Sequence, residues 1–402
     1  MADPNALQRR SSRVDRIRRK QPRPAADGRV APAWRPAAAE FFAGIGLVRL
    51  ALERQGFRVV FANDIDEDKL EIYRDNFDAA DFHLGDIHQL DAAAIPGCEL
   101  FTASFPCNDL SVAGARAGLE GGQSSAFWGL VRILEARQER RPNLVLLENV
   151  PGFLTSHGGK DFEAALAALG GLGYACDAFL LDAAHFTPQS RLRMFVVAKR
   201  DVSARPTFGL QSSALRSASL VNFIHAHPQL PWDIAPLPAP PVREQALESI
   251  LEDLADDDPA WWSCERADYF MAQLSERHAA IAEEMIAGRT PRFATAFRRV
   301  RKGRSMAELR TDGVAGCLRT PRGGSGRQIL FKAGKGRYQV RLLTARECAR
   351  LQGVPDSFEI NVRLNQALFG FGDAVCVPAV EWIAEHYLRP YLKHAAAAVA
   401  GG

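Results

Sequence analysis

The sequence predicts an α/β protein with a mostly parallel sheet covered by helices on both faces, followed by a smaller, irregular domain. Between about residues 40 and 200, short apolar runs alternate with amphipathic helical patterns, as parallel strands and their crossover helices do. The alternation breaks near Pro206, where prolines and serines become frequent. A block rich in arginine and glycine comes later in the chain and resembles neither region.

Apolar runs predict strands at 39–42, 58–62, 82–84, 100–104, 144–147, 174–181 and 193–198. Helical spacing predicts helices at 46–55, 68–76, 125–140 and 160–170. The stretch from 179 to 198 has the pattern of two strands around a loop, which indicates an antiparallel pair at one edge of the sheet.

The second half of the chain is expected to be less regular. Residues 202–243 are interpreted as a linker or irregular domain start, 244–287 as an acidic helical segment, and 289–346 as flexible basic loops. Thr344, with Glu347 three residues later, is typical of a capping box at the start of a helix over about 342–352. A final helix is expected at about 377–388, where apolar residues share one face.

Charge is strongly segregated along the 402 residues, although the net charge is only +3. Residues 1–36 carry a net +7 and are interpreted as a disordered basic tail. Residues 244–287 carry a net −10, and residues 289–346, with sixteen Lys/Arg and two Asp/Glu, a net +14. A basic block of this size favours a polyanionic partner, although a solvated surface is the alternative.

Cysteine spacing and hydropathy argue against several classes of protein. The seven cysteines are scattered and form no CxxC pair, which argues for reduced thiols in a cytoplasmic setting and against a metal site or disulfide framework. No run approaches the eighteen apolar residues of a membrane span, and the N-terminus lacks the apolar core of a secretory signal.

Polar side chains and glycines follow three consecutive strands. The first strand runs into the turn Phe42-Ala43-Gly44-Ile45-Gly46, the second ends at Asp64, and the third ends near Asp86. Each feature alone is more often a tight turn or a helix N-cap. Together they predict an adenosine pocket, because glycines let a ligand approach a helix start and an acid about twenty residues later can bind a ribose.

A thiol and a carboxyl stand at the exits of two further strands. Cys107 follows the run at 100–104, and Glu148 follows the run at 144–147. A thiolate can add to an electron-poor ring, and a carboxylic acid can protonate it. Arg191 and Arg193 share one face of a strand and can serve a base carbonyl, a phosphate or the thiolate. The alternatives are an inert buried cysteine, a surface carboxylate and an edge-strand charge pair.

Six motifs in order resemble the DNA (cytosine-5) methyltransferase family. They are Phe42-Ala43-Gly44-Ile45-Gly46, Ser104-Phe105-Pro106-Cys107, Glu148-Asn149-Val150, Gln189-x-Arg191-x-Arg193, the segment Arg341–Gly353, and Gln366-x6-Gly372-Asp373-Ala374-Val375. The resemblance covers about Glu40 to Tyr391, interrupted by roughly 202–314. There are two departures from the family pattern: Asn108 replaces the usual glutamine, and Asp373-Ala374 replaces the usual Asn-Ser.

The resemblance implies a Rossmann-like, S-adenosyl-L-methionine-dependent fold. It divides the chain into a basic tail (1–36), a catalytic domain (37–201), a target-recognition domain with DNA-binding loops (202–358), a C-terminal segment that returns to the catalytic domain (359–395) and a tail (396–402). The implied catalytic residues are Cys107, Glu148, Arg191 and Arg193. The implied cofactor contacts are Phe42, Ala43, Gly44, Ile45, Gly46, Asp64, Ile65, Asp86, Ile87, Pro106, Phe127, Asp373 and Ala374. Asn108, Ser111, Arg319, Arg322 and Arg327 are expected to contact DNA.

The resemblance further implies action as a monomer on double-stranded DNA, in the cytoplasm at the nucleoid, with a cognate restriction or defence system as a possible partner. Two alternatives stay open. One is a tRNA cytosine-5 methyltransferase, which is disfavoured because that branch lacks a large recognition region. The other is a catalytically dead DNA-binding regulator, which the two departures motivate and the intact Cys107, Glu148 and Arg193 oppose.

Overall fold

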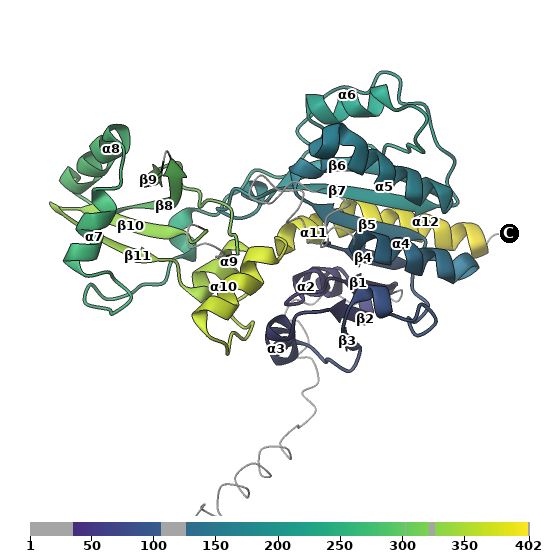
Figure 1. Ribbon diagram of the computed structural model, residues 1–402, viewed down its shortest axis with the longest axis horizontal. Helices are drawn as coiled ribbons and strands as arrows, with labels where there is room; N and C mark the ends of the chain where they lie inside the picture. Colours follow the sequence, from purple (N-terminus) through teal and green to yellow (C-terminus); the bar gives the residue numbers. More distant parts are fainter. Residues whose placement is uncertain (1–34, 106–125, 302, 321–325, 401–402) are drawn as a thin grey trace, which may run out of the picture. The chain divides into compact units, whose positions relative to one another are not determined.

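The computed structural model describes residues 35–105, 126–301, 303–320 and 326–400. Its larger sheet has seven strands in the order β3-β2-β1-β4-β5-β7-β6 (Figure 1). The strands are β1 (Ala37–Phe41), β2 (Arg58–Asp64), β3 (Phe82–Leu84), β4 (Leu100–Ala103), β5 (Leu144–Asn149), β6 (Tyr174–Asp182) and β7 (Leu192–Arg200). β1 to β5 pair in parallel, whereas β7 runs antiparallel to both β5 and β6. The predicted mostly parallel sheet and its antiparallel edge pair are confirmed.

The helices of the first half are α2 (Leu47–Arg54), α3 (Glu67–Asn76), α4 (Ala126–Arg137) and α5 (Lys160–Gly171), close to the predicted ranges. Successive strand residues point to opposite faces of the sheet, so both faces carry side chains that helices can cover. Phe41 of β1 packs into one core with α4 and α5. Its neighbour Glu40 lies near Arg49 of α2. Covering both faces leaves the carboxyl ends of the strands as the place for a site.

A helix that the sequence analysis missed lies in the segment interpreted as a linker. Residues Ala218–Ala226 form α6, and its Leu220 and Ile224 are buried in the same core as α4 and α5. Trp232 is also part of that core and pairs with Cys176 of β6 through a short β-bridge. Proline and serine content hid a short helix whose apolar positions are only a few residues apart.

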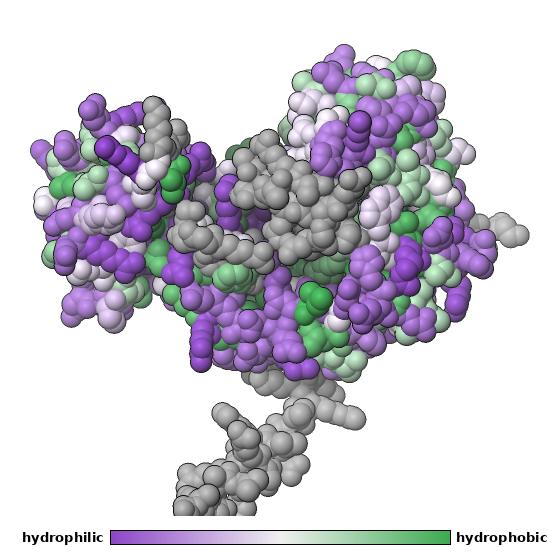
Figure 2. Space-filling view, in the orientation of Figure 1, coloured by the Kyte–Doolittle hydropathy of each residue, from purple (hydrophilic) through white to green (hydrophobic). Residues whose placement is uncertain are grey.

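The basic block folds as a second sheet, which corrects the prediction of flexible loops. The strands β8 (Arg292–Arg301), β9 (Arg304–Arg310), β10 (Ile329–Gly334) and β11 (Arg337–Leu342) are antiparallel in the order β11-β10-β8-β9. The acidic segment supplies α7 (Cys264–Met271) and α8 (Glu276–Ala287), which pack on this sheet through Phe270 and Met285. Figure 2 shows mainly hydrophilic residues on the visible face of this region.

The chain ends in helices α9 (Ala345–Leu351), α10 (Leu364–Asp373), α11 (Val377–Ile383) and α12 (Arg389–Ala400), with a π-helical stretch (Ala384–Leu388) before α12. The capping box predicted for Thr344 and Glu347 is present at the start of α9. The stretch Leu364–Ala396 is long and apolar enough to span a membrane by length and composition alone. However, 67% of its most apolar window is buried inside the protein, as in a core helix of a soluble protein.

Candidate active site and cofactor pocket

The glycine turn after β1 has the geometry expected of a ligand-binding loop. Gly44 and Gly46 have φ angles of +56° and +83°, which favour glycine, and a Cβ on Gly46 would lie 2.4 Å from the ring of Phe77. Phe42 is also left-handed, with φ +57°. The turn opens α2, so its backbone lies beside a helix N-terminus.

The acid at the end of β2 is joined directly to this turn. Asp64 is buried, and its Oδ2 accepts a hydrogen bond from the backbone N–H of Gly44 at 2.7 Å. Its Oδ1 accepts from the N–H of Asp66 at 3.0 Å. The neighbouring Ile65 is 69% exposed, which leaves an apolar side chain available to a planar ring. The structure therefore joins Asp64 directly to Gly44 and leaves the next residue, Ile65, exposed, while their roles as cofactor contacts stay predictions.

The end of β3 lies next to the same pocket, because β3 pairs with β2. Asp86 caps the short helix Ile87–Gln89 through its Oδ1, which accepts from the N–H of His88 at 2.9 Å. Ile87 is buried in the main core. Asp86 is therefore a helix N-cap, which was the alternative to a ligand contact. The cap uses one carboxylate oxygen and leaves the other for further contacts.

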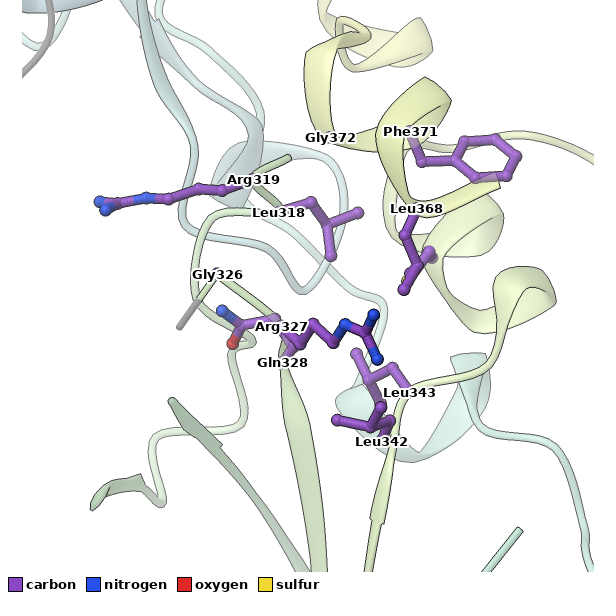
Figure 3. A pocket seen from close by; sticks show the side chains of 11 residues that line it. Leu318, Arg319, Gly326, Arg327, Gln328, Leu342, Leu343, Leu368, Phe371 and Gly372 are labelled. Atoms are coloured by element: carbon purple, nitrogen blue, oxygen red, sulfur yellow. The ribbon is translucent and has the colours of Figure 1, made fainter. Parts of the chain in front are cut away.

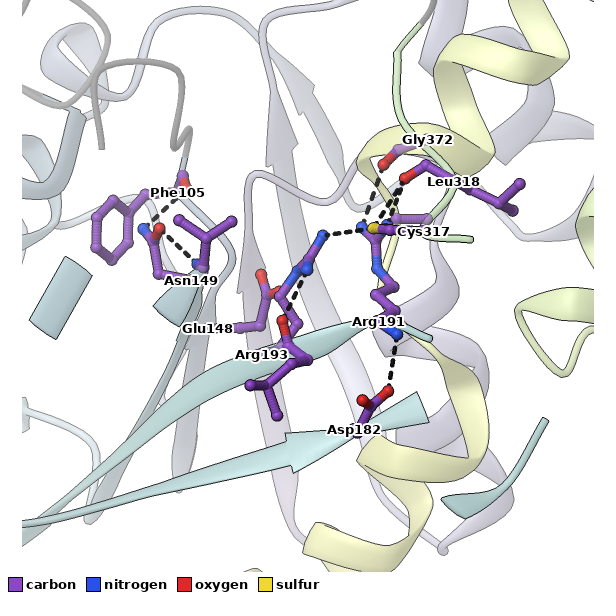
Figure 4. A network of polar contacts seen from close by, with 12 residues as sticks. Phe105, Glu148, Asn149, Asp182, Arg191, Arg193, Cys317, Leu318 and Gly372 are labelled. Atoms are coloured by element: carbon purple, nitrogen blue, oxygen red, sulfur yellow. Dashed lines mark hydrogen bonds and ion pairs between the residues drawn. The ribbon is translucent and has the colours of Figure 1, made fainter. Parts of the chain in front are cut away.

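The carboxyl predicted to be catalytic lies beside the predicted arginine pair (Figure 4). Glu148 at the end of β5 is buried, and its Oε1 is 3.0 Å from Nε of Arg193 on β7. This ion pair depends on the register, which places Glu148 opposite Phe195, two residues from Arg193. An arginine and a carboxylate side by side can hold a planar ring that offers a carbonyl oxygen and a ring nitrogen.

Arg191 is a buried connector. Its Nη1 donates to the carbonyl of Leu318 at 2.8 Å, and its Nη2 donates to the carbonyl of Gly372 at 3.1 Å. Its backbone N–H donates to Asp182 at 2.7 Å. Burial lowers the pKa of Arg191 below its ordinary value. Arg191 therefore joins β7 to the segment before β10 and to the end of α10.

The sequence analysis missed Cys317 as a member of this cluster. Its sulfur lies 3.4 Å from Nη1 of Arg191 and 3.8 Å from Nη2 of Arg193. Burial alone would raise the pKa of the Cys317 thiol, but the two guanidinium groups outweigh burial and lower it. Cys317 is 124 residues from Arg193 in the chain, and nothing in one sequence distinguishes it from the other scattered cysteines.

Asn149, the residue after Glu148, holds Phe105, the last described residue before the segment that carries Cys107. Nδ2 of Asn149 donates to the carbonyl of Phe105 at 3.4 Å, and the ring of Phe105 packs against Phe127 and Phe153. Cys107, Pro106, Asn108 and Ser111, together with Arg322, lie outside the described residues. Their predicted roles stay predictions.

Two of the arginines expected to contact DNA border a pocket lined by Leu318, Leu343, Leu368 and Phe371 (Figure 3). Arg319 is exposed and extends away from the pocket. Arg327 lies across the pocket, and its Nη2 donates to Asn365 at 2.6 Å. Arg319 is therefore better placed than Arg327 to bind an external ligand.

The family model described as C-5 cytosine-specific DNA methylase matches residues 37–389. The chain belongs to this family. It is 29% identical over 344 residues to the Type II methyltransferase M.NgoBI of Neisseria gonorrhoeae, covering 85% of this chain and 90% of the relative. It is 30% identical over 358 residues to M.NlaX of Neisseria lactamica, covering 86% and 94%.

The fold of this methylase is shared with solved structures. The S. pombe Dnmt2 methyltransferase superposes with a TM-score of 0.59 at 20% identity, covering 89% of this chain and 99% of the other. A putative DNA modification methyltransferase encoded within an E. coli prophage gives a TM-score of 0.53 at 19% identity. The predicted fold is confirmed, and so is the predicted activity: the chain is a DNA (cytosine-5) methyltransferase that uses S-adenosylmethionine.

Two residues predicted to contact the methylase's cofactor, Phe127 and Asp373, already contact other side chains. Phe127 is fully buried between Phe105 and Trp128, so its contact with the cofactor stays a prediction. Asp373, one of the two departures from the family pattern, lies at the end of α10 and forms an ion pair with Lys69, with Oδ2 and Nζ 2.8 Å apart. No motif or pattern in the sequence marked Lys69 as a candidate site residue.

Proposed function

We propose that this methyltransferase modifies a cytosine flipped out of double-stranded DNA, with Cys107 as the nucleophile and Glu148, Arg193 and Arg191 as its partners. The observation that carries the proposal is the Glu148–Arg193 pair, held at the strand ends and linked through Asn149 to the segment that leads to Cys107. A base inside a duplex presents neither ring face to a side chain, so the target has to leave the stack.

S-adenosylmethionine supplies an electrophilic methyl group when it is bound. The glycine turn, Asp64 and the exposed Ile65 fit an adenosine, because they combine open backbone, a carboxylate for ribose hydroxyls and an apolar face. Asp86 and Ile87 are assigned to the adenine side. Phe42, Ala43, Ile45, Pro106, Phe127, Asp373 and Ala374 complete the proposed pocket.

The chain's own residues activate the cytosine. The thiolate of Cys107 adds to C6, which converts the C4–C5 bond into an enamine and makes C5 nucleophilic. Glu148 hydrogen-bonds or protonates N3 and offsets the charge that develops in the ring. Arg193 contacts O2, and Arg191 holds the neighbouring segments in place. After C5 has been methylated, a base removes its proton and the Cys107 thiolate leaves, which restores the ring.

DNA contacts are assigned to the target-recognition domain, proposed at 202–358. Arg319 is exposed beside the site, and the hairpin formed by β8 and β9 carries several further arginines. Arg322, Arg327, Asn108 and Ser111 belong to the same proposed interface. The relatives are named Type II methyltransferases, which supports a role for this chain as the modification enzyme of a restriction or related defence system. We assign it to the cytoplasm, as a monomer on DNA.

A trapping experiment tests the mechanism. Duplex DNA that carries 5-fluorocytosine cannot lose a proton from C5, so wild-type protein with S-adenosylmethionine should become covalently joined to it. Bisulfite sequencing of DNA from cells that express the protein identifies the target sequence for the probe. Cys107→Ala should bind the same DNA but form no adduct. An adduct that persists in Cys107→Ala, or methylation of tRNA in place of duplex DNA, would overturn the proposal.

A further inference from the structure

An ion pair beside the glycine turn joins two segments of the proposed cofactor pocket. Lys69, the third residue of α3, is mostly buried, and its Nζ lies 2.8 Å from Oδ2 of Asp373 and 3.9 Å from Oδ2 of Asp66. The Lys69 stem passes the glycine turn, because a Cβ built on Gly44 would lie 3.9 Å from its Cδ. Lys69 therefore reaches from α3 along the turn to the end of α10.

Lys69 is the cation of a crowded acidic site. Asp64, Asp66 and Asp373 all act on it electrostatically. Burial alone would lower the pKa of Lys69, but these carboxylates outweigh burial and hold this pKa above its ordinary value. A ligand that brings one more carboxylate to this place meets strong repulsion unless the lysine is present and charged.

We propose that Lys69 and Asp373 form one cofactor-positioning unit, in which the lysine neutralises the aspartate so that the pocket accepts the amino-acid carboxylate of S-adenosylmethionine. This inference rests on the proposed cofactor site. It explains how the chain carries an acid at position 373, where the family usually has an asparagine. An asparagine is neutral, whereas an aspartate adds a negative charge to a site that already holds Asp64 and Asp66.

The ion pair is not needed to hold α10 against α3. Gln366 of α10 already donates to the carbonyl of Asp68 at 2.9 Å and to Glu71 at 2.8 Å, both on α3. Gly370 of α10 also packs closely, since a Cβ there would lie 2.8 Å from Ile45. These contacts hold α10 against α3 and the glycine turn without Lys69.

Binding of two related ligands separates the charge role from a structural role. S-adenosylhomocysteine contains the amino-acid carboxylate, and 5′-methylthioadenosine has the same adenosine and thioether but no carboxylate. Calorimetric titration of Lys69→Met should show S-adenosylhomocysteine bound about tenfold more weakly, or about 1.4 kcal/mol, with 5′-methylthioadenosine unchanged. Asp373→Asn alone should bind S-adenosylhomocysteine at least as tightly as wild type, and the double variant should return to within about threefold of wild type.

Arg54→Met is the matched control, because Arg54 of α2 pairs with Glu381 of α11 at 3.1 Å, likewise joining an early helix to the C-terminal helices. It should leave both affinities unchanged. The inference is overturned if Lys69→Met weakens both ligands equally, if it weakens neither, or if Asp373→Asn does not rescue it. Failure of wild-type protein to bind either ligand would instead overturn the proposed cofactor site, and the inference with it.

Discussion

At the residue scale, the site depends on one buried ion pair whose partners come from neighbouring antiparallel strands. The sequence identified Glu148, which directly follows an apolar run, and Arg193, which directly precedes one. It could not show that they touch, since contact depends on the register of β5 and β7. Cys317 escaped prediction for the same reason: only the fold brings it to the two arginines.

Glu148→Gln should reduce the single-turnover rate of methylation by about 10² or more, because general acid catalysis contributes that much. The amide keeps the shape of the side chain, so we expect DNA binding to change little. The control is Glu139→Gln. The Glu139 side chain is 94% exposed, and its carboxylate lies 2.7 Å from Arg200. A rate within threefold of wild type for Glu148→Gln would remove Glu148 from the mechanism.

A second residue-scale prediction concerns pH. Glu40 of β1 is 1% exposed, and burial raises its pKa from 4.5 to about 8. The folded state therefore holds a proton that the unfolded state releases above pH 4.5, so the free energy of unfolding falls as pH rises from about 5 to 8. Each pKa unit corresponds to about 1.4 kcal/mol, which makes the loss on the order of a few kcal/mol.

Glu40→Gln removes this titration. Urea unfolding between pH 5 and pH 9 should show a flatter profile for the variant, with its largest relative gain in stability at pH 8 to 9. Equal slopes for the variant and wild type over this range would show that Glu40 does not titrate as the fold implies.

At the element scale, the sequence placed all seven strands of the large sheet to within two residues. Buried parallel strands carry uninterrupted apolar runs, which makes them easy to detect. The smaller sheet was missed because β8 and β9 carry many arginines. The structure accommodates them in contacts that no periodicity reveals, such as Arg298 over the ring of Trp262 and Arg299 over Phe297.

The start of α9 gives an element-scale prediction. Glu347 is fully buried, accepts from Arg341 at 2.7 and 2.6 Å, and also accepts from the backbone N–H of Thr344. Glu347→Ala leaves the buried Arg341 without this partner, so it should cost about 3 to 5 kcal/mol of stability. Thr344→Ala removes the cap and the hydrogen bond that the hydroxyl donates to Glu252, but it leaves no buried charge unpaired, so it should cost about 1 kcal/mol. Denaturant unfolding of both variants measures the difference, and equal costs would contradict the assigned burial of the pair.

At the scale of the whole molecule, the excess positive charge of the basic block is partly neutralised by its own surroundings. At least six of its sixteen Lys/Arg pair with carboxylates, namely Arg292, Arg299, Arg310, Lys332, Arg337 and Arg341. Some partners, such as Asp256 and Glu284, come from the acidic segment. The two oppositely charged segments therefore fold together, and a net charge counted along the sequence overstates what is offered to DNA.

This neutralisation limits the salt dependence of DNA binding. At most ten Lys/Arg side chains of the block are left without a carboxylate partner. The block therefore contributes a slope of log Kobs against log[salt] no steeper than about −9. Arg304, exposed on the β8–β9 hairpin, should contribute to it, so Arg304→Ala should make the slope shallower by about 1. Arg292→Ala, whose guanidinium is held 3.4 Å from Glu284, should change the slope less. Fluorescence anisotropy at several salt concentrations measures the slopes. If neither variant shifts the slope, the hairpin does not hold phosphates. If both shift it equally, the pair with Glu284 does not keep Arg292 from the DNA.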